Sequence, residues 1–461
     1  MRSWRALSVL LVMLAGCATL PDYDALHRDR KWWRDDPPRV EGVRGPLAPQ
    51  RRAEILRRLA EQGDGTLLQR HLAFMQAISD IPLVTGNDVQ LLVDGPATRA
   101  AMFRAIEAAH EEILLETYIF EDDEFGRQLA ERLLAKRAAG LRVHVIYDSL
   151  GSTFTPRSFF DHLRAGGVGV CEYNPINPLR ARIFNPNQRD HRKLLVVDGA
   201  TAFTGGINIS SAYARSSLVF WKKPAEPPPT EHGGWRDTHI EIRGPAAVKF
   251  RELFADTWRR QHCPGVAARD ELPPPQPQGD KLVRVIGTSP DNDRNLIYLE
   301  LLSAIDHAQK SVFITMAYFV PDPGMIRALA EAARRGVDVK LVLADAGNYR
   351  LVFHAGRSKY SELLAAGVQI YEWRTAPLHA KTAVIDGVWS NVGSANLDWR
   401  SFLHNDEVNA VILGESFARE MEALFERDLA LATPVTLADW SRRGYGERLK
   451  EFGARIIEYW L

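Results

Sequence analysis

The sequence contains one short pattern twice: His, any residue, Lys, four mostly apolar residues and Asp. The copies read HRKLLVVD and HAKTAVID, and their polar residues are His191, Lys193 and Asp198, then His379, Lys381 and Asp386. Each apolar run is expected to form a strand, in which side chains alternate between two faces. The His and Lys of one copy then share a face, and the Asp points the other way. We therefore take all six motif residues as the candidate catalytic set, in which each His and Lys is expected in the site itself and each Asp is expected to support the fold.

A turn rich in small residues follows each copy, TGGINIS after the first and VGSANLD after the second. Small residues let the backbone approach a ligand closely, and an Asn side chain supplies amide donors. The candidates for substrate binding are therefore Gly206 and Asn208 in the first turn and Ser394 and Asn396 in the second.

These residue types suit chemistry on a phosphodiester. If the two copies face each other, their pocket holds two imidazoles, two ammonium groups and two carboxamides, without a carboxylate cluster for a metal. Lys and Asn can donate to the non-bridging oxygens as negative charge builds up in the transition state. One His can attack phosphorus and form a phosphohistidine, while the other protonates the leaving alkoxide and later deprotonates the acceptor. No metal or other cofactor is expected.

Each imidazole of this kind needs an acceptor that holds its far nitrogen as N–H. In the second half the candidate is Glu407 in LHNDEVNAVIL, on the strand expected to follow His379. In the first half Asp237 in WRDTHIEIRGP is its equivalent, after a further insertion. These assignments place each carboxylate in the same half as its His.

The elements around the motifs are duplicated as well. Both halves show the succession helix, strand, helix, strand, with a helical period near 3.6 followed by short runs rich in Val, Leu and Ile. Tyr118 and Tyr318 occupy equivalent strand ends, where they are expected in the core or along the pocket. The predicted fold class is α/β, with two similar lobes, each a mixed sheet flanked by helices, that form one pseudo-two-fold active site.

The predicted organisation has five parts. They are a signal peptide at 1–16, an N-terminal helical region at 17–84, a first lobe at 85–265, a Pro-rich linker at 266–281, and a second lobe with a C-terminal extension at 282–461.

The N-terminal segment indicates export. Two arginines precede an apolar run that is about half the roughly 20 residues a bilayer-spanning helix needs. The stretch LAGC resembles a bacterial lipobox, in which Cys17 is lipidated; an ordinary signal with an incidental Cys is the alternative. We expect a lipoprotein of the cell envelope that faces the periplasm or exterior, with inner or outer membrane left open. Cys171 and Cys263 either pair or stay as buried thiols.

The charge balance bears on partners. Lys plus Arg and Asp plus Glu both total 58, so the formal net charge is zero. A chain without a basic excess has no field for non-specific nucleic-acid binding, so no nucleic-acid partner is expected. The expected partners are a phospholipid substrate and, through the lipid anchor, a membrane surface.

The doubled motif with its downstream Asn resembles the phospholipase D superfamily, and the stretches around Asp237, Glu407 and the C-terminus are similar to bacterial cardiolipin synthases. The resemblance covers roughly residues 85–461. It implies two phospholipase D-like lobes, a metal-independent site, His191 as nucleophile and His379 as acid and base. It also implies transfer of a phosphatidyl group between two phosphatidylglycerol molecules. A hydrolase that uses water as acceptor is the alternative, which the motifs do not separate.

Overall fold

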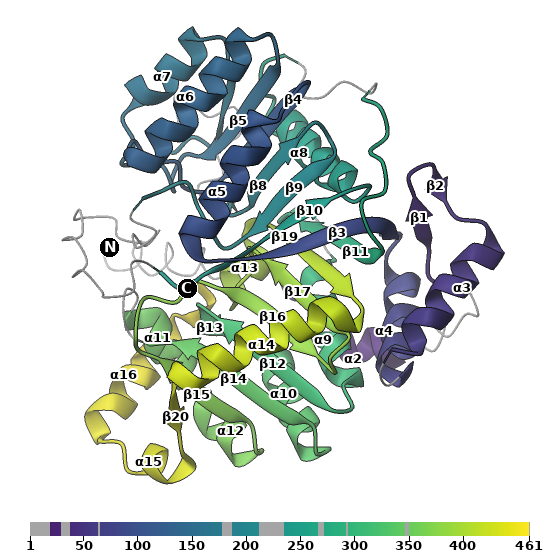
Figure 1. Ribbon diagram of the computed structural model, residues 1–461. Helices are drawn as coiled ribbons and strands as arrows, with labels where there is room; N and C mark the ends of the chain where they lie inside the picture. The colour runs from purple at the N-terminus through teal and green to yellow at the C-terminus, as the bar shows by residue number, and fades with distance from the viewer. Residues whose placement is uncertain are drawn as a thin grey trace, which may run out of the picture.

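Two α/β lobes are joined edge to edge through one continuous sheet (Figure 1). The computed structural model describes residues 19–28, 37–62, 65–177, 187–211, 235–265, 272–291, 294–345 and 350–460. The signal segment with Cys17, residues 266–271 of the Pro-rich linker and part of the loop before His191 lie outside the described residues. The arrangement confirms the α/β fold class and the two similar lobes.

The first lobe is built on seven strands in the order β6-β5-β4-β8-β9-β10-β3. They are β3 (Leu83–Val93), β4 (Glu112–Thr117), β5 (Arg142–Asp148), β6 (Gly169–Tyr173), β8 (Lys193–Val197), β9 (Thr201–Gly205) and β10 (Thr238–Arg243). The strands β4, β5 and β6 are parallel to one another, and the other pairs are antiparallel. Because parallel strands need a crossover, helices connect the first three.

Helices cover both faces of this first sheet. One face packs on α5 (Asp94–Glu107), α6 (Glu124–Ala138) and α7 (Arg157–Ala165), and the other on α8 (Ala247–Arg260). Alternate residues of β4 show the division, since Ile113 and Leu115 lie in the first cluster and Leu114 in the second. This alternation is the period of two expected of a strand buried on both faces. A disulfide joins Cys171 of β6 to Cys263 beyond α8.

The second lobe repeats the pattern in the order β15-β14-β12-β16-β17-β19-β11. Its strands are β11 (Lys281–Thr288), β12 (Ser311–Met316), β14 (Asp338–Ala344), β15 (Gln369–Trp373), β16 (Lys381–Ile385), β17 (Trp389–Gly393) and β19 (Asn405–Leu413), with β20 (Thr433–Val435) added beside β15. Its helices include α9 (Leu296–His307), α10 (Pro323–Arg334), α11 (Arg350–Arg357), α12 (Tyr360–Ala365), α13 (Trp399–Leu403) and α14 (Glu415–Leu431).

The lobes share one core in addition to the sheet. Strand β3 pairs with β11, with Val84 opposite Val283, and so continues the sheet from one lobe into the other. On one face α8 of the first lobe and α14 of the second belong to a single buried cluster that contains Phe250, Phe254 and Phe417. The relative position of the two motif copies is therefore fixed by both backbone pairing and side-chain packing.

The N-terminal region packs on the second lobe and contains more than helices. It has α2 (Tyr23–Arg28), α3 (Pro49–Ala60) and α4 (Gly65–Ile78), but also a short hairpin of β1 (Val40–Gly42) and β2 (Gly45–Pro46) that pairs with β3. The hairpin was not predicted from the sequence, because its strands are too short to give a period. Buried His71 of α4 contacts Ser303 and Glu300 of α9.

The chain ends in α15 (Leu437–Ser441), α16 (Tyr445–Ile456) and a short 3₁₀ turn. These elements lie beside α11 and α12 at the outer end of the second lobe (Figure 1). Across the described ranges, no helix combines the length and apolar character that a bilayer crossing requires.

Candidate active site

Both motif histidines lie where the lobes meet, immediately before β8 and β16. His191 and His379 are buried. Burial is the main cause that lowers the pKa of both imidazoles, and the lysine of the opposite lobe adds to it, Lys381 for His191 and Lys193 for His379. The two copies therefore form one site, as the repeat predicts.

Each imidazole is held by a carboxylate from the opposite lobe. His191 Nδ1 lies 3.0 Å and 3.1 Å from the two carboxylate oxygens of Glu407, and His379 Nδ1 lies 2.9 Å from Asp237 Oδ2. Asp237 and Glu407 are the carboxylates that the sequence singles out, but their assignment within each half is wrong. The pairs are exchanged between lobes, and in each imidazole Nε2 is the nitrogen that faces away from the carboxylate.

Backbone pairing across the lobe boundary explains the exchange. A two-residue strand, β7 (Arg189–Asp190), runs parallel to the start of β19, and the His191 N–H donates to the carbonyl of Asp406 at 2.9 Å. On the other side the His379 N–H donates to the carbonyl of Arg236 at 2.9 Å. Because Asp406 precedes Glu407 and Arg236 precedes Asp237, each bond places a carboxylate beside the histidine of the other lobe.

The two lysines are buried and oriented by their own motifs. Lys193 Nζ donates to the carbonyl of His191 at 2.6 Å, and Lys381 Nζ donates to that of His379 at 2.5 Å. Burial lowers the pKa of Lys193 to about 7 and that of Lys381 to about 8, and Glu407 and Asp237 oppose the shift. Each Lys thus faces the site with its His, as the alternation of a strand predicts.

Asp198 and Asp386 lie at the far ends of β8 and β16 and support the fold. The Asp198 carboxylate accepts the backbone N–H groups of residues 110, 111 and 112 at 2.8 to 2.9 Å. Asp386 accepts those of residues 309, 310 and 311 at 2.7 to 2.9 Å. Both carboxylates fix the start of a neighbouring strand and touch neither imidazole, so they belong to the motif without belonging to the reacting groups.

The small-residue turns contribute differently to the two half-sites. The Ser394 hydroxyl donates to Glu407 Oε2 at 2.5 Å, whereas a Cβ at the equivalent Gly206 would lie 2.1 Å from Asp237 Oδ1. Asn208 Oδ1 accepts the backbone N–H of Ile119 at 3.2 Å. The buried Oδ1 of Asn396 has no hydrogen-bond partner within the described part of the chain. The turns therefore position the carboxylates and offer amides near the site.

Aromatic rings surround the imidazoles. Tyr118 packs edge-on against His191, with ring centroids 5.2 Å apart, and Tyr318 lies in the same relation to His379 at 6.2 Å. Both tyrosines thus line the site, one of the two placements that the sequence left open. Trp235, 5.6 Å from His379, is a contact that the sequence analysis missed. Its only signal was its place two residues before Asp237, at the end of an insertion.

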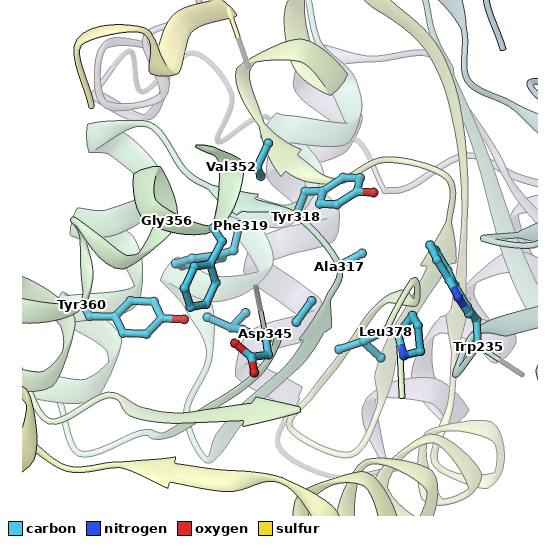
Figure 2. Close-up of a pocket in the computed structure, with 13 residues that line it drawn as sticks. Trp235, Ala317, Tyr318, Phe319, Asp345, Val352, Gly356, Tyr360 and Leu378 are labelled. Carbon is cyan, nitrogen blue, oxygen red and sulfur yellow. The ribbon is translucent and has the colours of Figure 1, made fainter. Parts of the chain in front are cut away.

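A pocket adjoins the His379 side of the site. Trp235 and Tyr318 form one end, Leu378 and Phe319 lie along it, and Tyr360 and Asp345 bring a hydroxyl and a carboxylate to the other end (Figure 2). The empty space amounts to about 550 Å³ and includes its opening to solvent. Its walls are mostly apolar with a few polar groups, the composition common in small-molecule sites.

Burial keeps both imidazoles neutral. It lowers the pKa of His191 to about 4 and that of His379 to about 3, while their carboxylates act in the opposite direction. The pKa of Glu407 falls to about 2 and that of Asp237 is also lowered, because the histidines and lysines favour the ionised carboxylates over the cost of burial. A neutral imidazole with Nδ1–H held by a carboxylate presents a lone pair at Nε2, which is the form a nucleophile or base requires.

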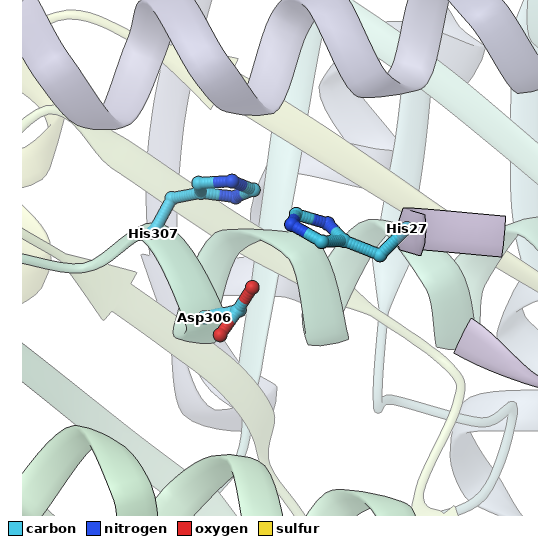
Figure 3. Close-up of side chains that lie close together, drawn as sticks. All are labelled: His27, Asp306 and His307. Carbon is cyan, nitrogen blue, oxygen red and sulfur yellow. The ribbon is translucent and has the colours of Figure 1, made fainter. Parts of the chain in front are cut away.

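Away from the imidazoles, one cluster among the described residues has the residue types of a metal site. His27 of α2, with Asp306 and His307 at the end of α9, could each offer one ligand atom (Figure 3). In this structure Tyr23 donates to Asp306 Oδ2 at 3.0 Å, and His307 Nδ1 donates to the carbonyl of Ser303 at 2.8 Å. The cluster is near the Asp386 end of β16, on the order of 20 Å along the strand from His379. It does not take part in the arrangement around the imidazoles.

Comparisons with known proteins agree with this geometry. A family model described as "Cardiolipin synthase, PLD-like domain" matches residues 102–219 and 301–429, one match in each lobe. Cardiolipin synthase A of Pseudomonas aeruginosa is 37% identical over 377 residues, which cover 81% of this chain and 73% of the relative. A cardiolipin synthase of Geobacillus thermodenitrificans is 33% identical over 84% of this chain and 74% of the relative.

A solved structure shows the same fold at much lower sequence identity. The phosphatidylserine synthase of Haemophilus influenzae aligns with a TM-score of 0.58 and 11% identity, covering 88% of this chain and 100% of that protein. The fold is therefore shared with a protein that is only 11% identical in sequence.

Proposed function

This chain belongs to the cardiolipin synthase family of phospholipase D-like proteins, and we propose that it transfers a phosphatidyl group from one phosphatidylglycerol to a second, releasing glycerol. The observation that carries the proposal is the pair of neutral, carboxylate-held imidazoles flanked by two buried lysines. Two such groups suit a displacement at phosphorus that needs a nucleophile and a separate acid and base.

In the first step His191 Nε2 attacks phosphorus and an N–P bond forms. The bond from phosphorus to the glycerol oxygen breaks, and protonated His379 gives its proton to that oxygen. The free site holds His379 neutral, but the negative charge of a bound phosphodiester favours the imidazolium and so allows it to pick up the required proton. Lys193 and Lys381 stabilise the non-bridging oxygens as charge gathers there.

In the second step neutral His379 takes the proton from a hydroxyl of the second phosphatidylglycerol. The resulting oxygen attacks phosphorus, the N–P bond breaks, and the electron pair returns to His191. Two lipids are consumed, and one cardiolipin and one glycerol are formed. Glu407 and Asp237 stay ionised throughout and hold the imidazoles in the orientation that each step requires.

The test is to incubate the purified protein with phosphatidylglycerol vesicles and to identify the products by mass. We expect one cardiolipin and one glycerol for every two lipids consumed. Phosphatidic acid as the main product would overturn the transferase proposal and identify water as the acceptor.

We also propose that the protein is a lipid-anchored member of the cell envelope that faces the periplasm or exterior. Support comes from the LAGC stretch with Cys17 and from the Cys171 to Cys263 disulfide, since such bonds persist in oxidising compartments. The test is to express the chain in bacteria with a labelled fatty acid. We expect label in the parent protein and none in Cys17→Ser; equal labelling of both would refute the anchor.

A further inference from the structure

Helix α16 carries a row of large apolar side chains that face solvent. Tyr445, Leu449, Phe452 and Ile456 are exposed by 88%, 71%, 63% and 71%. At 100° per residue they occupy an arc of about 60° on the helix. Single exposed apolar residues are common, but four in a row on one helix mark an interaction surface. These four residues are called the α16 stripe below.

The opposite face of α16 is fixed to the protein. Ala454 belongs to a small buried cluster with Val352 and Ala355 of α11. Buried Glu451 forms an ion pair with Arg443 at 3.1 Å and approaches Arg357 of α11 at 3.9 Å. Because α16 packs on the protein by this face, the α16 stripe faces solvent in a fixed orientation.

Basic side chains border the stripe on one side. The helical spacing puts exposed Arg448 and Arg455 along that edge. Lys450 points well away from the stripe and forms an ion pair with Glu447 at 2.7 Å. The Arg448 guanidinium lies over the ring of Tyr445, 5.8 Å from its centroid. An apolar face beside long cationic side chains matches an anionic phospholipid surface, where apolar groups enter the acyl boundary and cations reach the headgroups.

The stripe is also connected to the pocket beside His379. Helix α11, on which α16 packs, contributes Val352, Phe353 and Gly356 to the wall of that pocket. A surface that touches the membrane at α16 would therefore hold this pocket close to the lipid phase from which a phospholipid substrate must come.

We propose that the α16 stripe docks the enzyme on an anionic phospholipid bilayer and presents the lobe interface to its lipid substrates. The inference rests on the proposed function for the nature of the substrate, but the docking itself is measured without turnover. A second copy of this chain on the stripe is the competing occupant, and the experiment separates the two.

The test places an environment-sensitive fluorophore on the stripe. In a Cys17→Ser chain, which lacks the anchor while Cys171 and Cys263 stay paired, Phe452→Cys is labelled and mixed with phosphatidylglycerol vesicles. Lys450→Cys, on the same helix but off the stripe, is the matched control. We expect a blue shift and stronger emission with vesicles at position 452 and little change at 450. Equal responses, no response at 452, or a shift without vesicles that grows with protein concentration would overturn the proposal.

A second variant links docking to turnover. The variant Leu449→Ser/Phe452→Ser removes two stripe side chains. It should weaken vesicle binding of the unanchored chain by about tenfold or more, because the apolar surface that both side chains bury in the bilayer is lost. Cardiolipin formation on vesicles should fall in parallel, whereas activity on dispersed short-chain phosphatidylglycerol and the melting temperature should not change. Unaltered vesicle binding would refute docking. Absence of cardiolipin from the parent chain on dispersed lipid would instead refute the proposed function.

Discussion

The two half-sites use the same motif but are built from different surroundings. On the His191 side Glu407 accepts from three side chains, those of His191, Ser394 and Asn405. On the His379 side the shorter Asp237 accepts from the imidazole and from the backbone N–H of Thr238. The two carboxylates therefore have different hydrogen-bond donors. The duplicated motif does not imply that the two histidines have the same role.

The residue between His and Lys shows the difference most clearly. Arg192 is buried and donates to Thr257 Oγ1 at 2.7 Å and to the carbonyls of Thr288 and Glu407. Its counterpart is Ala380, which is fully buried in the apolar cluster shared by the lobes. A buried guanidinium with several acceptors ties His191 rigidly to both lobes, whereas the His379 side opens on the largely apolar pocket. This contrast agrees with the proposed roles. The nucleophile His191 is held in one position, and His379, which exchanges protons with the leaving and attacking hydroxyl groups, lies beside a pocket that can admit them.

The largest effects are expected from the histidines themselves. His191→Ala and His379→Ala should each lower cardiolipin formation by at least about a thousandfold, because each loses a reacting group. A phosphatidyl ester with a good leaving group separates their roles, since it needs no general acid in the first step. With this ester we expect His379→Ala to accumulate a phosphatidyl-histidine, seen by mass after alkaline digestion, and His191→Ala to form none. An adduct on His379 in the parent protein would reverse the assignment.

The carboxylates come next and test the exchange between lobes. Glu407→Gln and Asp237→Asn should each lower cardiolipin formation by about a hundredfold, because the imidazole loses the acceptor for Nδ1–H. With the activated ester, Glu407→Gln should slow formation of the adduct, and Asp237→Asn should leave that rate close to the parent value. The opposite result would mean that each carboxylate serves the histidine of its own lobe.

Local patterns predicted the parts of the site that depend on local geometry. The duplicated motif and the alternation of strands gave the two lobes, the inward His and Lys, and the outward Asp198 and Asp386. The same reasoning singled out Asp237 and Glu407 but paired them wrongly. That pairing is set by β7 against β19 and by Arg236 against Leu378, contacts between residues far apart in the sequence. Trp235 was missed for the same reason, since its contact with His379 also crosses the lobes.

Substitutions in the two small-residue turns should have smaller effects on cardiolipin formation, and the effects should differ between the turns. Gly206→Ser puts a Cβ against the Asp237 carboxylate, which has to move, so we expect cardiolipin formation to fall by about thirtyfold. Ser394→Gly removes one hydrogen bond to Glu407 and leaves two, which is worth about 1 kcal/mol or about fivefold in rate. Initial rates on the same vesicles measure both. Equal losses would show that the turns are interchangeable and would weaken the contrast between the half-sites.

The smallest expected difference lies in the response of the two lysines to pH. Turnover needs charged lysines, so kcat at saturating lipid should fall as the pH rises through about 7 to 8, the pKa values of Lys193 and Lys381. The rate is taken at saturation because the bound phosphodiester is what favours the imidazolium of His379. Lys193→Arg should move the alkaline fall upward because a guanidinium stays charged, and should leave the later loss of the Lys381 proton. Lys381→Arg should move it less, since Lys193 titrates first. Rates on dispersed short-chain lipid from pH 4 to 9 measure this, and an alkaline limb that neither variant moves would assign it to another group.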